Sequence, residues 1–390
     1  MKSILQQTLE RKGTDSVKWD GLERWFHLSE DVLPLWVADI DIRTAPSISE
    51  ALASKAASGE FGYTLFSREA QSAVSSWYGR RHGLDVDPTH VLFSSGVVPG
   101  LTHIVEALTA VGDGVVIQSP VYPPFHELVT GSKRELFDAP LKIVEGRYEM
   151  DFDALEDAMR HAKMFLLCSP HNPVGRVWTE EELSRVVELA NKHDVIIVAD
   201  EIHADLTYPS FEHTAINKLD PNVITVSAPS KAFNIAGLFA SYIICPEESW
   251  RKRIIKVQNK HHVLPTPFAN TAIIAAYTDP RAERWLQQLT TELEEQMAAI
   301  IERIQTELPM LTVYRPEASY LLWIDFSSIP LSSEERKKWL HDEVRLFLSP
   351  GTPFGESGDD FERMNIGTRR ELLDEAIERL VSQTKRNAFV

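Results

Sequence analysis

Short hydrophobic runs alternate with amphipathic stretches between residues 91 and 245. The short runs predict strands at 91–93, 115–118, 165–168, 195–199, 223–227 and 242–245. Several are apolar at consecutive positions, as strands buried on both faces are. The pattern therefore predicts an α/β fold with a mostly parallel central sheet that helices cover on both sides.

The helical patterns divide the chain further. In TEEELSRVVELANKH, Thr179 and Glu182 have the spacing of a capping box at the start of a helix. Beyond residue 246 long charged helices are expected at 249–261 and 281–308, followed by a strand at 320–325. We therefore expect a large domain over 47–280 and a smaller α+β domain over 281–390, which the N-terminal arm (1–46) completes.

Composition narrows the function classes. The 390 residues are 43% hydrophobic, and 40 Lys and Arg face 57 Asp and Glu, a formal net charge of −17. This excess of negative charge disfavours nucleic acid and anionic membranes as partners. The two cysteines, Cys168 and Cys245, lie in apolar runs, and residues 1–15 lack the apolar stretch of a signal peptide. We therefore expect a cytoplasmic protein without a membrane span.

Common nucleotide, hydrolase and metal motifs are missing. The chain contains no GxGxxG, GxxxxGK[ST], GxSxG or HExxH, and its histidines lack metal-ligand spacing. What remains is a set of polar motifs after the predicted strands: SSGVVPGL, SPVYPP, SPHNPVG, ADEIH and SAPSKAFN. Because the carboxyl ends of parallel strands bind ligands in α/β sheets, these motifs are the candidates for chemistry, and no metal is expected.

Three of these motifs suggest a heterocyclic, phosphorylated ligand. After Gly96 a helix start could present its amides to a phosphate, although a plain strand-to-helix turn has the same pattern. Asp200 ends the apolar run VIIVAD, where it either caps the next segment or pairs with a protonated ring nitrogen. Lys231 is either a solvated lysine or, within SxxSKxFN, a Schiff-base lysine.

Taken together, the ordered set Gly96, Tyr122, Asn172, Asp200 and Lys231 resembles the fold-type I pyridoxal-phosphate enzymes of the aspartate aminotransferase superfamily. Within it, the chain resembles the MalY/PatB branch of cystathionine β-lyases and cysteine-S-conjugate β-lyases. The motifs that carry this likeness are SVKWD (16–20), PLWVADID (34–41), FGYT (61–64), SPHNPVGR, ADEIH, PSKAFNIAGL and RMNIG (363–367).

For the cofactor ring, the resemblance implies one role per residue. Lys231 would bond covalently to pyridoxal 5'-phosphate, and Asp200 would pair with its pyridinium nitrogen. Asn172 would hold the ring hydroxyl oxygen, assisted by His203, which stands where aminotransferases commonly have a tyrosine. Tyr122 would stack on the ring. Lys231, Tyr122 and Asp200 are thus the expected catalytic residues.

The phosphate and the substrate have their own expected partners. The phosphate would be held by the amides of Gly96, Val97 and Val98 together with Ser230. Tyr63 of FGYT resembles the tyrosine that reaches the phosphate of a neighbouring subunit, which implies a homodimer with shared sites. Arg363 would clamp the substrate α-carboxylate, and the backbone of Ala38 would donate to it.

Two positions depart from the aminotransferase pattern. Aminotransferases commonly carry a phosphate-binding serine three residues before the lysine and an arginine eight residues after it. Here these positions are Ala228 and Phe239. The sequence therefore leaves open which residues bind the phosphate. The departure from the aminotransferase pattern agrees with the β-lyase branch.

The resemblance implies a pyridoxal-phosphate-dependent β-lyase that cleaves L-cystathionine or related cysteine S-conjugates to a thiol, pyruvate and ammonia. An aminotransferase using the same residues is the first alternative. A regulatory protein that binds a transcription factor through its surface is the second, from another class. The sequence leaves the thiol half of the substrate open.

Overall fold

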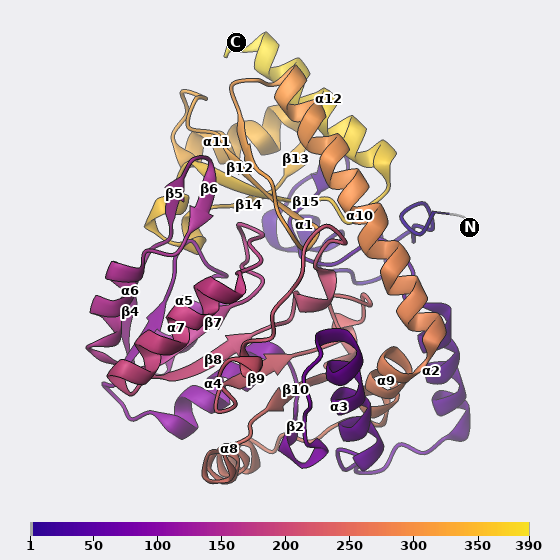
Figure 1. Cartoon of the computed structure of the whole chain (residues 1–390). Helices are drawn as coiled ribbons and strands as arrows, with labels where there is room; N and C mark the ends of the chain where they lie inside the picture. The colour runs from indigo at the N-terminus through magenta and orange to yellow at the C-terminus, as the bar shows by residue number, and fades with distance from the viewer. Residues whose placement is uncertain (1–2, 390) are drawn as a thin grey trace.

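A seven-stranded sheet forms the centre of the computed structural model, which describes residues 3–389 (Figure 1). Its strand order is β2-β10-β9-β8-β7-β3-β4. The strands span Val91–Ser94 (β2), Gly114–Ile117 (β3), Glu135–Asp138 (β4), Ala162–Cys168 (β7), Ile196–Asp200 (β8), Ile224–Ser227 (β9) and Ser241–Ile244 (β10).

The direction of the strands confirms a mostly parallel sheet. β4, β3, β7, β8 and β9 run parallel, whereas β10 is antiparallel to both β9 and β2. All six predicted strands are present, with β7 starting earlier than expected. β4 was not predicted, because this edge strand is only partly buried and lacks a continuous apolar run.

β7 shows why its sequence is apolar at every position from Met164 to Cys168. Phe165 and Leu167 pack on one face of the sheet with residues of α6 (Phe152–Met159) and α7 (Glu180–His193). Met164 and Leu166 pack on the other face, against α4 (Val97–Leu108) and α5 (Pro124–Gly131). Alternate side chains of a strand point to opposite faces, so helices on both sides require hydrophobic residues throughout.

The helices agree with the predicted pattern. α7 begins with the expected capping box, in which the Thr179 hydroxyl accepts from the Glu182 amide and the Glu182 carboxylate accepts from the Thr179 amide. The other helices are α1 (Gly21–Phe26), α2 (Pro46–Ser58), α3 (Arg68–His82), α8 (Glu248–Lys260), α9 (Pro267–Thr278), α10 (Pro280–Glu307), α11 (Ser333–Trp339) and α12 (Arg370–Arg386).

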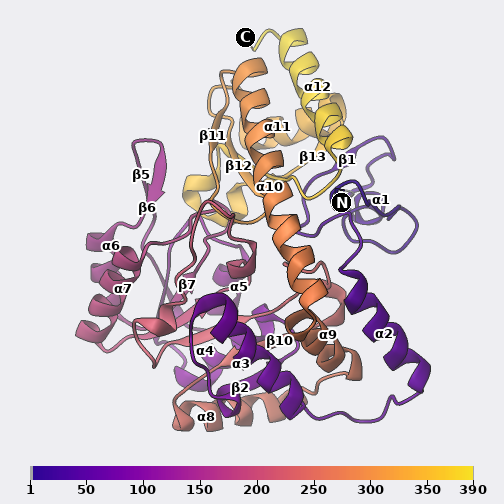
Figure 2. The ribbon, with the colours of Figure 1, turned by 45° about the vertical axis from the view of Figure 1, so that its right-hand side comes forward.

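A second sheet lies at the end of the molecule where α10 and α12 pack together (Figure 2). It has the order β11-β12-β15-β14, with antiparallel neighbours. Its strands are Thr312–Tyr314 (β11), Leu321–Asp325 (β12), Ser349–Pro350 (β14) and Phe361–Asn365 (β15). The N-terminal segment joins this region, because β1 (Leu33–Pro34) pairs with β13 (Leu346–Phe347). β5 (Lys142–Val144) and β6 (Arg147–Glu149) form a two-stranded antiparallel hairpin that pairs with neither of these sheets.

Residues 36–42, here called the strap, run between the two sheets and are held from both sides. Asn234 donates to the carbonyl of Ile40 at 2.7 Å and accepts from its amide at 3.1 Å. Asn365, at the end of β15, donates to the carbonyl of Asp39 at 2.6 Å. The strap therefore has a fixed course although its sequence has no helical or strand periodicity.

A buried ion pair explains the SVKWD motif. Lys18 is fully buried and its Nζ lies 2.7 Å from Oδ2 of Asp41, while the indole of Trp19 donates to Oδ1 at 2.9 Å. A buried carboxylate needs such partners. The motif thus anchors the end of the strap.

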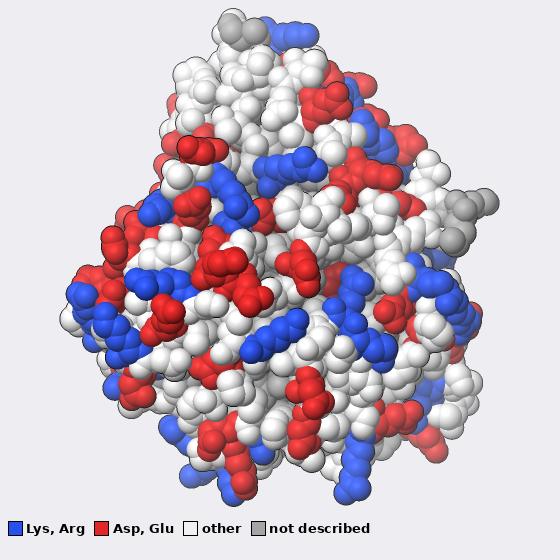
Figure 3. Space-filling view, in the orientation of Figure 1, with Lys and Arg blue, Asp and Glu red and all other residues white. Residues whose placement is uncertain are grey.

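The surface seen in Figure 3 carries acidic and basic side chains interspersed rather than in separate fields. Among the described residues, no helix is both long and apolar enough to cross a membrane.

Candidate active site

A cavity of about 220 Å³ lies at the carboxyl ends of the parallel strands. Asp200 ends β8, and Lys231 follows β9 after a short turn. Ten of the twelve predicted site residues line this cavity: Ala38, Gly96, Val97, Val98, Tyr122, Asn172, Asp200, His203, Ser230 and Lys231. Parallel strands place their ends at one edge, which brings motifs more than a hundred residues apart together.

Lys231 is held toward the strap. Its Nζ donates to the carbonyl of Ala38 at 2.6 Å. Burial, together with the nearby charge of Arg363, lowers the pKa of Lys231 to about 8. The neutral, nucleophilic amine is therefore accessible closer to neutral pH than in an ordinary lysine.

Asp200 is a buried carboxyl group on which the nearby charge of Lys231 acts without forming a salt bridge. It is 4% exposed, and its Oδ1 accepts from the amide of Ile202 at 3.0 Å. Burial raises its pKa to about 7. No ion pair of Asp200 occurs among residues 3–389, so a cationic ring nitrogen in the cavity would supply the missing partner.

His203 and Asn172 offer donors to the same cavity. His203 is 3% exposed, and its Nδ1 has no hydrogen-bond partner among residues 3–389. Burial lowers the pKa of His203 to about 3, which keeps its ring neutral. The Oδ1 of Asn172 accepts from Nη1 of Arg363 at 3.0 Å, so its NH2 group is the donor that remains for a ligand.

The opposite end of the cavity is shaped for an anion. Gly96 has φ 155°, and a Cβ there would lie 3.1 Å from Cδ of Pro99. α4 starts at Val97 without a side-chain cap, so its first amides are available. Together with Ser230 they form a site in which the helix dipole favours a phosphate.

Arg363 lies on β15, in the second sheet, and reaches this cavity through its hydrogen bond to Asn172. It is 6% exposed, and its Nη2 donates to the carbonyl of Trp36 and to Oγ of Ser349, both at 3.2 Å. Its Nε has no partner, and no carboxylate forms an ion pair with it among the described residues. Burial lowers its pKa to about 10, so the guanidinium stays charged. A buried, unpaired guanidinium suits an external carboxylate.

A second cavity of about 240 Å³ adjoins the first, since both are lined by Tyr122. We call it the aromatic cavity, because its wall includes Phe26, Trp36, Phe347 and Phe354. The rings of Phe26 and Trp36 meet edge to face with centroids 5.5 Å apart. Arg363 also lines it, so a molecule bound to the guanidinium would face this apolar space.

Tyr63 is the predicted residue that lies apart from both cavities. Its side chain is fully exposed, next to the exposed Phe61 and Leu65. Of the two positions that depart from aminotransferases, Phe239 lines the first cavity, whereas Ala228 is buried in the core. Within one chain the tyrosine therefore contributes nothing to the cavity.

The sequence did not single out the residues that fix the strap. Tyr320 is buried and donates from its hydroxyl to the carbonyl of Ala38 at 3.0 Å. Asn234 and Asn365 hold the strap from its two sides. The two asparagines stand inside PSKAFNIAGL and RMNIG, so their motifs were visible, but backbone hydrogen bonds leave no periodic signal.

Comparison with known proteins places this geometry in a family. Residues 30–380 match the family model of aminotransferase class I and II. The cystathionine β-lyase PatB of Bacillus subtilis is 40% identical over 378 residues, covering 95% of this chain and 97% of PatB. The protein MalY of Escherichia coli is 29% identical, covering 96% and 97%.

Solved structures of similar proteins have the same fold as this chain. Cystalysin from Treponema denticola, which contains a pyridoxal 5'-phosphate cofactor, superposes with a TM-score of 0.94 at 31% identity, covering 99% of this chain and all of its own. The pyridoxal-phosphate-bound C–S lyase from Staphylococcus hominis gives 0.90 at 29%, covering 98% of each chain. The family match spans most of the chain, and this protein therefore belongs to the aminotransferase class I and II family.

Proposed function

We propose that this protein is a pyridoxal-phosphate-dependent carbon–sulfur lyase, which cleaves L-cystathionine or a related cysteine S-conjugate to a thiol, pyruvate and ammonia. The observation that carries the proposal is the buried, unpaired guanidinium of Arg363 beside the cavity that holds Lys231 and Asp200. The names of the relatives, a cystathionine β-lyase and C–S lyases, support the same reaction class.

The residues of the first cavity fit pyridoxal 5'-phosphate group by group. Lys231 has a pKa suited to bonding with an aldehyde, and the buried carboxyl of Asp200, which forms no ion pair among the described residues, suits a pyridinium nitrogen. The unpartnered Nδ1 of His203 lies in the same cavity, ready for the ring's polar substituent. When bound, the ring withdraws electrons from the substrate's α-carbon. Tyr122 would pack on this ring.

The chain's own groups then have defined tasks. Arg363 binds the α-carboxylate and orients the Cα–H bond toward Lys231. The Nζ of Lys231 takes the Cα proton, for which an amine with a pKa of about 8 is suited. Burial raises the pKa of Asp200 to about 7, so a cationic ring nitrogen facing it would favour its ionised form, and that charge would in turn keep the ring nitrogen protonated.

Cleavage of the C–S bond leaves its electron pair on sulfur, which then needs a proton. Two donors line the cavity: the protonated Nζ of Lys231 and the hydroxyl of Tyr122, whose pKa burial raises. The three-carbon fragment takes up water to give pyruvate and ammonia. We propose that the aromatic cavity receives the sulfur substituent, because it adjoins Arg363 and Tyr122.

The direct test is an assay of the purified holoenzyme with L-cystathionine and no added keto acid. A lyase releases pyruvate and free thiol in equal amounts over many turnovers. An aminotransferase would stop after one turnover and resume when a keto acid is supplied, and that result would overturn the proposal. S-methyl-cysteine and S-benzyl-cysteine in the same assay test the role of the aromatic cavity.

We also propose a homodimer in which Tyr63 reaches the partner's phosphate. Its complete exposure beside Phe61 and Leu65 supports this, since such a tyrosine is free to meet another chain. The division at 1–46, 47–280 and 281–390 is proposed likewise, supported by α10, which starts at Pro280. The cytoplasm is the proposed compartment, supported by two buried cysteines that form no disulfide.

A further inference from the structure

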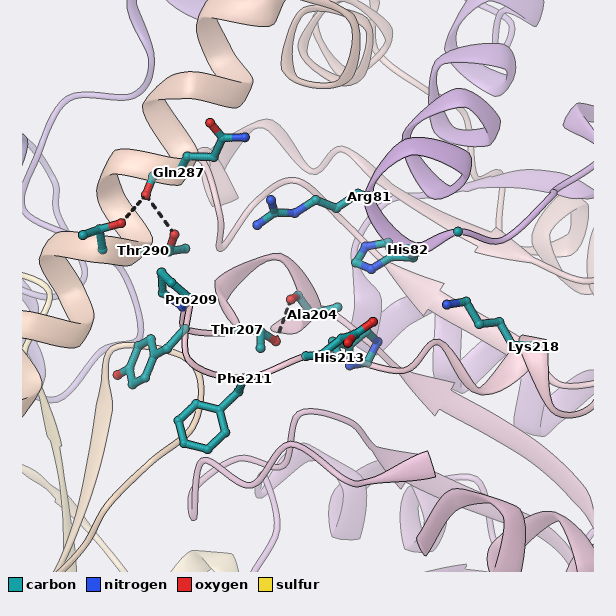
Figure 4. A pocket seen from close by; sticks show the side chains of 14 residues that line it. Arg81, His82, Ala204, Thr207, Pro209, Phe211, His213, Lys218, Gln287 and Thr290 are labelled. Atoms are coloured by element: carbon teal, nitrogen blue, oxygen red, sulfur yellow. Dashed lines mark hydrogen bonds between the residues drawn. The ribbon is translucent and has the colours of Figure 1, made fainter. Parts of the chain in front are cut away.

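A cavity of about 540 Å³ lies away from the residues described so far (Figure 4). Its wall is formed by the end of α3, the segment 204–213 and the middle of α10. It shares no lining residue with the cavity of Lys231, and it is the larger of the two. Its volume falls within the range of about 300–1,000 Å³ that is typical of small-molecule sites.

Two cations line this wall, and the charge of one of them, Arg81, helps to lower the pKa of the buried Asp205. Arg81 projects into the cavity in Figure 4, and Lys218 lines it from the other side of His82. Neither forms a hydrogen bond or an ion pair among the described residues, whereas the neighbouring Arg80 bonds the carbonyl of Tyr277. Their donors are therefore available to a ligand.

A buried histidine in the same wall is also incompletely bonded. His213 is 7% exposed, and neither of its ring nitrogens has a hydrogen-bond partner in the part of the chain that the structure describes. Its Nε2 lies 3.5 Å from Oε1 of Glu201, outside good hydrogen-bond geometry. Buried polar side chains without partners are rare in folded proteins, so His213 indicates that the cavity takes a polar molecule.

The charges of the wall limit what that molecule is. The buried Asp205 behind the wall already accepts from Nε1 of Trp77 at 3.1 Å and lies 3.2 Å from Nε2 of His82. Glu212 lines the cavity as an exposed carboxylate without an ion pair among residues 3–389. Arg81 and Lys218 thus face two carboxylates, Glu212 and Asp205, so the wall has little net positive charge and suits a singly charged carboxylate better than phosphate, whose charge is about −1.5 to −2 at neutral pH.

We propose that this cavity binds a small organic carboxylate of net charge −1, held by Arg81 and Lys218 with His213 as a further polar contact. An amino acid would in addition place its ammonium group toward Glu212, while a hydroxy acid would not. This site goes beyond the proposed lyase reaction, and binding to it is measurable without turnover.

Isothermal titration of the holoenzyme tests the proposal with L-glutamate and L-lactate as probes and inorganic phosphate as the comparison. The site predicts saturable binding of at least one carboxylate that weakens about tenfold or more in Arg81→Gln and in Lys218→Gln. It remains in Arg363→Lys, which separates it from the cavity of Lys231. Arg185→Gln, an exposed arginine on α7, is the matched control.

The two probes also distinguish a site that is specific for amino acids from one that binds carboxylates in general. Binding of glutamate alone, lost in Glu212→Gln, identifies an amino-acid site, whereas equal binding of both probes identifies a site for carboxylates in general. Binding of phosphate alone, binding of neither carboxylate at 10 mM, chosen as about tenfold above a 1 mM Kd, or binding that Arg81→Gln leaves unchanged overturns the proposal.

Discussion

Arg363 donates from Nη1 to Oδ1 of Asn172 at 3.0 Å, and this bond joins the second sheet to the edge of the first. The guanidinium lies between the cavity of Lys231 and the aromatic cavity. Its planar group has donors left over after it has bonded the protein, because Nε is unpartnered. The position of a carboxylate bound there is therefore fixed relative to the groups that surround Lys231.

Replacing Arg363 by lysine is expected to raise KM and lower kcat together. A lysine supplies a point charge, but it cannot align the carboxylate through two parallel hydrogen bonds. We expect kcat/KM for cystathionine to fall about 10- to 100-fold, as for the loss of one hydrogen bond to a charged group. Cofactor content, measured by absorbance, should stay unchanged. A loss of cofactor with an unaltered KM would contradict the carboxylate role.

Lys231→Ala should abolish the visible absorbance of the covalently held cofactor and nearly all turnover. The same Nζ is proposed both to anchor the cofactor and to take the Cα proton, so both functions disappear together. Spectra and pyruvate release of the purified variant measure them. Normal turnover in this variant would rule out the central assignment.

Asp200→Asn should change stability with opposite signs in the two forms of the protein. Without cofactor, the folded state raises the pKa of Asp200 from 3.8 to about 7, so it binds the proton more tightly than the unfolded state. The contribution of this group to the free energy of unfolding therefore falls as pH rises from about 4 to 7. At pH 8 the cofactor-free variant should be more stable than the parent by roughly 2–4 kcal/mol, and equal to it near pH 4.

With cofactor bound, the parent should instead be more stable than Asp200→Asn at pH 8, because asparagine cannot neutralise a pyridinium nitrogen. Urea unfolding at both pH values, with and without cofactor, measures the four states. Asp205→Asn is the control, since bonds from His82 and Trp77 lower the pKa of that buried carboxyl despite its burial. Its removal should destabilise the protein at pH 8. If the parent and the Asp200→Asn variant are equally stable at pH 8 without cofactor, the folded state does not raise the pKa of Asp200 as proposed.

Phe26→Ala should lower kcat/KM for S-benzyl-cysteine about fivefold or more, while S-methyl-cysteine is little affected. The ring of Phe26 lines the aromatic cavity and packs on Trp36 and Phe347, so its loss removes apolar contact with a large substituent only. The neighbouring Trp25→Ala is the matched control, because Trp25 also meets Trp36 edge to face but does not line the cavity. Equal losses of kcat/KM for both substrates would show that the aromatic cavity does not bind the sulfur substituent.

Tyr63→Phe tests the shared site. If its hydroxyl reaches the partner's phosphate, the variant should release cofactor about tenfold or more faster while the fold is retained. Mixed dimers of Tyr63→Phe and Lys231→Ala subunits should regain part of the activity, because one of their two sites has both groups. Absence of recovery despite verified subunit exchange would exclude the shared arrangement.

Sequence pattern and structure agree where periodicity carries the information. The strand ends that bear Asp200 and Lys231 were predictable, because a run apolar at consecutive positions marks a buried parallel strand and polar residues after it face the ligand edge. Arg363 could be found only through resemblance, since its strand belongs to another sheet. The roles of all these residues stay predictions until the variants are measured.

The aromatic cavity was not predictable, for a physical reason. Phe26 and Trp36 meet Phe347 only after β1 has paired with β13, more than three hundred residues along the chain. The strap has an irregular backbone with bends, and side chains that donate to its carbonyls help to fix its course. Neither feature leaves a repeating pattern of polar and apolar positions.

The strap limits how parts of this fold can be exchanged between relatives. Lys231 and Asn234, beside the first sheet, and Asn365, on the second, all bond the backbone of residues 38–40. A chimaera that takes its C-terminal region from another member of the family would have to bring a compatible N-terminal segment with it. Residues near the start of the chain and near its end would therefore have to be exchanged together, although about three hundred residues of sequence separate them.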